Sequence, residues 1–99
     1  MNDAELLDRA TKAKAILESQ IYQESWEATR NAIIALIEKT PLSETSTAED
    51  LRRCLKLLKD VRTNVEAVFA QGKVAEFRLS QQQQKATDER RGIIRGLFR

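Results

Sequence analysis

The sequence predicts an all-α fold: a helical hairpin or three-helix bundle with a long, projecting C-terminal helix. Two observations predict this class. The 99 residues include only three glycines and one proline, which are the residues that destabilise a helix interior most. Apolar residues also recur at steps of three and four, the spacing that places side chains on one face of an α-helix. A chain of this length is expected to form one domain with a thin core.

The first predicted helix begins near Asn2, because Asn2 and Glu5 have the spacing of a capping box. An apolar stripe follows, consisting of Leu6, Ala10, Ala13 and Leu17. Since two of these four side chains are single methyl groups, we expect this helix to approach its neighbour closely.

The second predicted helix carries the only tryptophan and the only tyrosine of the chain. Its stripe consists of Tyr22, Trp26, Thr29, Ile33 and Leu36. The step of five residues from Leu17 to Tyr22 breaks the helical phase, so we expect a kink or a short turn near residues 19–20. The alternative is one long helix whose buried face rotates.

Residues 40–47 form the clearest break in the helical pattern. Pro41 disfavours helical backbone at Thr40, and the surrounding serines and threonines favour turns. Ser46 with Glu49 then predicts a capping box for the next helix.

The third predicted helix has the most regular apolar pattern, which we call the predicted seam. It consists of Leu51, Cys54, Leu58, Val61, Val65 and Val68. A heptad-like pattern of this kind predicts either an internal core or a self-association surface. Cys54 is expected to be a buried small hydrophobic residue on it. The helix is expected to continue past Gly72. Three interpretations of this glycine stay open: a close-packing site, a kink or a C-cap.

Two regions are expected along the chain: a helical bundle domain over residues 1–79, and a polar, then basic-amphipathic, C-terminal segment over residues 80–99. The glutamine run at residues 81–84 is polar all round, which is typical of a solvent-bridging or flexible stretch. The net charge is +2, but residues 73–99 alone hold seven basic and three acidic residues. A charged tail is often an interaction element.

The composition argues against a catalytic or metal site. The chain has no histidine, one cysteine and no glycine-rich phosphate loop. It therefore lacks the commonest general base and metal ligand, and the lone cysteine lacks the partner that activates a thiolate. We expect no enzymatic activity, no cofactor and no metal.

The C-terminal segment is the predicted partner-binding site, formed by Arg91, Ile93, Ile94, Arg95, Leu97, Phe98 and Arg99. Drawn as a helix, its large apolar residues share one face, and its arginines recur every fourth residue. Docking into a groove of a protein partner is the preferred interpretation. Contact with nucleic-acid phosphates, contact with an anionic membrane and a tail without a role are the alternatives.

The expected location is the cytoplasm. No segment approaches the roughly 20 apolar residues that span a bilayer, so no membrane-spanning helix is predicted, and a membrane is not among the expected partners. The acidic start of the chain also lacks the apolar region of a secretory signal.

The stretch from Leu6 to Leu79 is similar in pattern to small helical proteins of tailed bacteriophages and prophages that are encoded near head-assembly and packaging genes. The features that carry the resemblance are the Ala/Leu helix, the aromatic segment at residues 21–26, the Ser/Thr linker, the segment at residues 51–61 and the Gly72–Lys73 step. The resemblance implies a virion or assembly context in a bacterial host cytoplasm. It carries over no catalytic residue.

The resulting hypothesis is a non-enzymatic phage structural or assembly component. It would form a homo-oligomer and dock through its C-terminal segment on a phage structural or host protein. Two alternatives stay open: a DNA-binding accessory in genome packaging, and a small inhibitor of a host protein.

Overall fold

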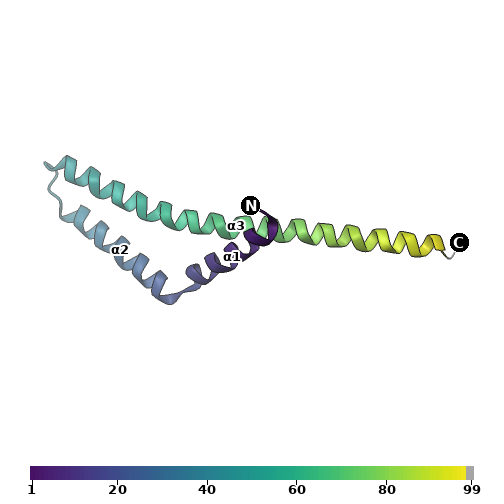
Figure 1. The fold of residues 1–99 in the computed structure, drawn as a ribbon. Coiled ribbons are helices and arrows are strands. Elements are labelled where there is room, and N and C mark those ends of the chain that lie inside the picture. Colours follow the sequence, from purple (N-terminus) through teal and green to yellow (C-terminus); the bar gives the residue numbers. More distant parts are fainter. Residues whose placement is uncertain (98–99) are drawn as a thin grey trace.

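The computed structural model describes the backbone of residues 1–97 and the side chains of residues 1–92. The described chain forms three α-helices: α1 (Asp3–Glu18), α2 (Gln20–Lys39) and α3 (Thr45–Leu97). α1 and α2 form a V whose two ends meet α3, and the rest of α3 projects beyond them (Figure 1). The predicted all-α class with a long C-terminal helix is confirmed.

Local hydrogen bonds explain where α1 and α2 begin and end. Asn2 Oδ1 accepts the Glu5 backbone N–H at 2.8 Å, so Asn2 caps α1 as predicted. Ser19 is the single extended residue between the two helices. Its backbone N–H donates to Ile16 O, and its Oγ accepts the Tyr22 backbone N–H. The predicted turn near residues 19–20 is thereby confirmed, and it forms the apex of the V.

α3 begins earlier than the capping pattern predicted. The Glu44 backbone N–H donates to Pro41 O at 2.9 Å, and Glu44 O accepts the Ala48 backbone N–H at 3.1 Å. The turn after Pro41 therefore leads directly into the helix, which starts at Thr45. Ser46 lies inside the first turn, so its prediction as the capping residue was wrong.

α1 packs on α3 through residues with small side chains. Ala10, Ala13 and Gly72 are buried, and Ala75 is fully buried. A methyl group added at Gly72 would overlap the Ala10 methyl group. The close approach expected of this helix is confirmed, and Gly72 acts as a close-packing site within a continuous helix.

α2 packs on α3 less completely than α1 does. Tyr22, Trp26 and Ile33 are half-buried as the stripe predicted, whereas Thr29 and Leu36 are exposed. The apex of the V lies away from α3 (Figure 1), yet Tyr22 near the apex is half-buried and Leu36 near the other end of α2 is exposed. Beyond Trp26 the half-buried positions include Arg30, Ile34 and Ile37, so the covered face of α2 runs about one position later than the predicted stripe.

The molecule is much longer than a compact domain. Its extents are 85 × 25 × 19 Å and its radius of gyration is 23.4 Å, whereas a compact chain of this length has about 13 Å. Every residue from 80 to 92 is exposed. In the described residues, no helix has an apolar stretch that would cross a bilayer.

Candidate interaction surfaces

The predicted seam is divided between two faces of α3. Leu51, Leu58, Val65 and Val68 are half-buried, but Cys54 is exposed and Val61 is 56% exposed. Beside α2, the half-buried face of α3 passes through Leu55 and Arg62 instead. The prediction that Cys54 is buried was therefore wrong, because α2 covers the neighbouring side of the helix.

Cys54, Leu57 and Val61 form an exposed apolar strip, which we call the Cys54–Val61 strip. Leu57 is 63% exposed. The strip leads toward a shallow hollow between α1 and α3 that is lined by Arg9, Lys12, Ala13, Ile16, Val65 and Val68. α1 ends at Glu18, so it covers the later part of this side of α3 and leaves the strip uncovered.

A second exposed apolar face, which the predicted seam does not include, lies on the other side of α3. It consists of Ala67, Ala70, Val74 and Phe77, which we call the outer face. Val74 is 54% exposed and Phe77 is 64% exposed. At 100° per residue, these four positions lie about half a turn from Gly72 and the α1 contact.

The same spacing rule that identified the predicted seam also identifies the outer face. Its steps are three, four and three residues, the pattern of a coiled-coil stripe. The predicted seam follows a single register along the third helix. A second register through Ala67 and Val74 was the signal that could have revealed this face.

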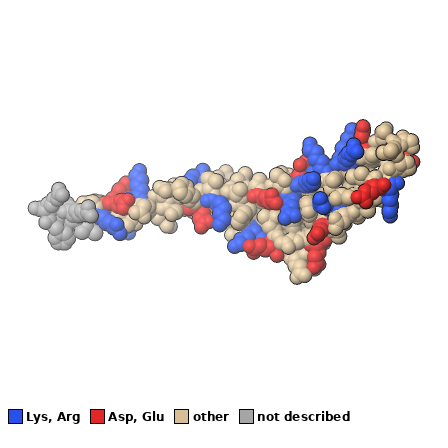
Figure 2. Space-filling view, turned by 180° about the vertical axis from the view of Figure 1, so that it is seen from behind, with Lys and Arg blue, Asp and Glu red and all other residues tan. Residues whose placement is uncertain are grey.

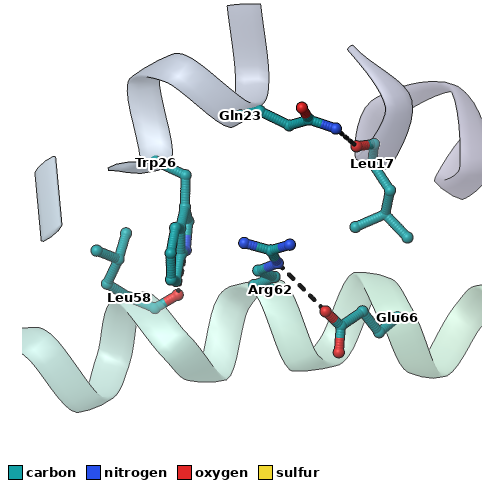
Figure 3. Close-up of polar contacts among 6 residues, drawn as sticks. All are labelled: Leu17, Gln23, Trp26, Leu58, Arg62 and Glu66. Carbon is teal, nitrogen blue, oxygen red and sulfur yellow. Dashed lines mark hydrogen bonds and ion pairs between the residues drawn. The ribbon is translucent and has the colours of Figure 1, made fainter. Parts of the chain in front are cut away.

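A polar cluster fastens α2 to α3 near the apex of the V (Figure 3). Trp26 Nε1 donates to Leu58 O at 3.2 Å, and the Arg62 guanidinium lies 4.6 Å from the centre of the Trp26 ring. Arg62 also pairs with Glu66, with Nε and Oε1 at 3.2 Å. Gln23 Nε2 donates to Leu17 O at 2.7 Å across the turn. The Trp26 hydrogen bond holds α2 against α3, and the Gln23 hydrogen bond holds α2 against the end of α1.

The predicted C-terminal site lies at the far end of the projecting helix. Arg91 is exposed and the helical backbone continues to Leu97. The side chains of Ile93, Ile94, Arg95 and Leu97 lie outside the described residues, as do Phe98 and Arg99 entirely. Between residues 80 and 92 the charged residues are Lys85, Asp88, Glu89, Arg90 and Arg91, and basic and acidic side chains lie near one another on this part of the helix (Figure 2).

Over the part of the chain that the structure describes, no three His, Cys, Asp or Glu residues gather as metal ligands. The expected lack of catalysis and of a metal stays a prediction. No family model, curated protein or solved structure matches this chain. The phage resemblance likewise stays a prediction.

Proposed function

We propose that this chain is a non-enzymatic helical interaction protein that associates with itself and docks on a protein partner through its C-terminal segment. The pattern-level resemblance described above extends the proposal to a structural or assembly role in a tailed-phage particle. The chain would then act in the bacterial host cytoplasm or within the virion.

The observation that carries self-association is the amount of surface left uncovered. A compact protein of 11.3 kDa exposes about 5,700 Å², but this chain exposes 8,019 Å². The excess is about 2,300 Å², well above the roughly 800 Å² that each partner contributes to a standard specific interface.

The core is correspondingly small. The buried apolar side chains among the described residues are those of Ala10, Ala13 and Ala75, and no large side chain there is fully buried. Burial of large apolar side chains is the dominant favourable term in folding. A second copy would supply the apolar cover that a single chain lacks.

The test is the absolute mass in solution, measured by light scattering after size-exclusion chromatography over a wide range of concentrations. We expect a multimer of the 11.3 kDa chain that dissociates on dilution. A monomer at every concentration, combined with cooperative unfolding, would contradict self-association.

Docking through the C-terminal segment is supported by its position. The described side chains of residues 81–91 are all exposed, and this segment projects beyond the V of α1 and α2 (Figure 1). Large apolar residues and arginines near the end of a projecting helix suit a groove with an acidic rim.

Truncation tests the docking proposal. Deletion of residues 91–99 should abolish capture of the partner, and it should leave the remaining helices folded and the number of copies in the oligomer unchanged. The matched control replaces Arg91, Arg95 and Arg99 with Gln, which keeps the apolar residues. If the truncated chain captures the same proteins as the full chain, the docking site lies elsewhere.

A protein partner is preferred to nucleic acid because the arginines of the C-terminal segment are accompanied by large apolar residues. One base of the region at residues 73–99 is also paired outside it, since Arg78 lies 3.0 Å from Asp3. Duplex DNA binding that weakens steeply with salt would instead favour the packaging accessory.

A further inference from the structure

We infer that two copies of this chain pair through the outer face of α3 in antiparallel orientation, with Ala67 opposite the partner's Phe77 and Ala70 opposite the partner's Val74. This inference rests on the proposed self-association and names the surface and the orientation that it uses.

The outer face is the centre of a longer heptad pattern, which we call the outer seam. It consists of Lys56, Asp60, Thr63, Ala67, Ala70, Val74, Phe77, Gln81, Gln84 and Asp88. The steps are four, three, four, three and so on without a slip, which is the spacing of a two-stranded coiled coil. All ten side chains are exposed. α1 packs on the opposite side of α3, so a second helix has access to the whole outer seam.

The apolar centre of the seam is complementary to itself only when the helices are antiparallel. Two small residues, Ala67 and Ala70, precede two larger ones, Val74 and Phe77. An antiparallel pairing places each small residue opposite a large one, which fills space as protein interiors require. A parallel pairing would set Phe77 against Phe77 and leave the alanine layers underfilled.

The polar layers outside the centre agree with the same register. Thr63 lies opposite the partner's Gln81, and Asp60 lies opposite the partner's Gln84, so each acceptor meets an amide donor. Lys56 lies opposite the partner's Asp88, a pair of opposite charges. A parallel pairing would instead place Lys56 and Asp88 each against its own copy, with like charges in contact.

The register also defines where the seam ends. One further layer outward would bring Arg53 opposite the partner's Arg91, two like charges. The paired region therefore runs from residue 56 to residue 88, a length of about 50 Å at 1.5 Å per residue. The same surface from each copy forms the interface, as a two-fold dimer requires.

This pairing also explains the projecting part of α3. The segment at residues 81–88 contacts no other element closely enough to be buried in one chain. In the antiparallel dimer it lies on residues 56–63 of the partner's α3, so both long helices are supported along the seam. The excess exposed surface of about 2,300 Å² easily accommodates an interface of about 800 Å² per chain.

Disulfide trapping tests the orientation directly. In a Cys54→Ser background, one chain carries Ala67→Cys and the other carries Phe77→Cys. The two are unfolded together in reductant, refolded, oxidised and identified by intact mass. We expect the mixed disulfide to dominate, because the two introduced thiols share one layer. Two Ala67→Cys chains would hold their thiols about 15 Å apart, beyond the reach of a disulfide.

A parallel seam would give homodisulfides of each variant, and a different interface would give no preferred product. Either outcome would overturn the inference. Neither substitution is expected to disturb the fold of the single chain, because both positions are exposed.

A pair of charge variants separates this inference from the proposed function. Val74→Glu with Phe77→Glu should raise the dimer dissociation constant roughly a hundredfold or more, since each lost apolar contact occurs twice. Leu57→Glu with Val61→Glu makes the same charge change on the Cys54–Val61 strip. This variant should remain a dimer in solution. Helix content of all variants is checked by circular dichroism.

If the outer-face variant stays dimeric while the Leu57/Val61 variant dissociates, the inference fails and self-association stands. If the unmodified chain is already monomeric, the proposed self-association itself fails.

Discussion

At Gly72 the backbone of α3 lies directly against Ala10 of α1. A methyl group added there would overlap the Ala10 methyl group and would lie 3.3 Å from Leu6 O. The contact is tight because both helices present only small groups at the crossing. Glycine is a poor helix former, but at this position its missing side chain is what allows the close approach of α1.

Gly72→Ala should destabilise the fold even though alanine is the better helix former by about 1 kcal/mol. Overpacking a tight contact costs about 1–3 kcal/mol, so we expect a net loss of roughly 1 kcal/mol in chemical unfolding. Gly92→Ala is the matched control, because a methyl group added at Gly92 meets nothing within 4 Å. A gain in stability from both substitutions would show that the crossing is loose.

The two aromatic residues of α2 differ in how their polar atoms are satisfied. Trp26 Nε1 donates to Leu58 O, whereas the buried Tyr22 hydroxyl has no hydrogen-bond partner among the described residues. Loss of a satisfied hydrogen bond costs about 1 kcal/mol, and an unsatisfied buried group carries a desolvation cost. We therefore expect Trp26→Phe to destabilise by about 1 kcal/mol, and Tyr22→Phe to be neutral or stabilising. Urea unfolding followed by circular dichroism compares them, and a larger loss for Tyr22→Phe would reveal an unseen partner.

Among the elements, α3 passes through three environments along its length. It lies first beside α2, then beside α1, and from residue 80 onward its described side chains are exposed. An isolated helical segment of a dozen residues is marginal in water. The projecting part therefore needs either the helix behind it or a second chain beside it.

Hydrogen exchange should reveal which of these supports the projecting part. If two chains pair along the outer seam, the amides of residues 81–88 gain protection as the protein concentration rises. The amides of α1 serve as the internal reference, because that helix packs within one chain. Protection at residues 81–88 that does not vary with concentration would contradict pairing there.

At the scale of the whole molecule, the V of α1 and α2 braces one end of an 85 Å rod. The bracing contacts include the Arg78–Asp3 ion pair and the buried alanines. Exposed ion pairs contribute little to stability, typically below about 1 kcal/mol. The single chain thus has a defined shape but a small apolar core.

Thermal unfolding should therefore depend on protein concentration. An oligomer unfolds at a higher temperature when it is more concentrated, since association stabilises the folded chains by mass action. We expect the unfolding midpoint of the unmodified chain to fall on dilution and the Val74→Glu, Phe77→Glu variant to lose this dependence. A midpoint that is constant for the unmodified chain would indicate a monomer.

The sequence by itself determined the elements and most of their ends. The Asn2 cap, the phase break before Tyr22 and the Pro41 turn are local effects of hydrogen bonding and backbone sterics. The helix through Gly72 follows from the surrounding helix formers. The C-terminal site at Arg91 and beyond stays a prediction, since most of its side chains lie outside the described residues.

Only the tertiary structure decided which apolar positions are covered. Periodicity places Cys54 and Val61 on the same stripe as Val65, but the end of α1 at Glu18 and the tilt of α2 leave the first two exposed. It also revealed the outer face through Val74 and Phe77. A helix presents a stripe in every register that its sequence supports, and only the neighbours that pack against it determine which stripe is buried and which remains available to a partner.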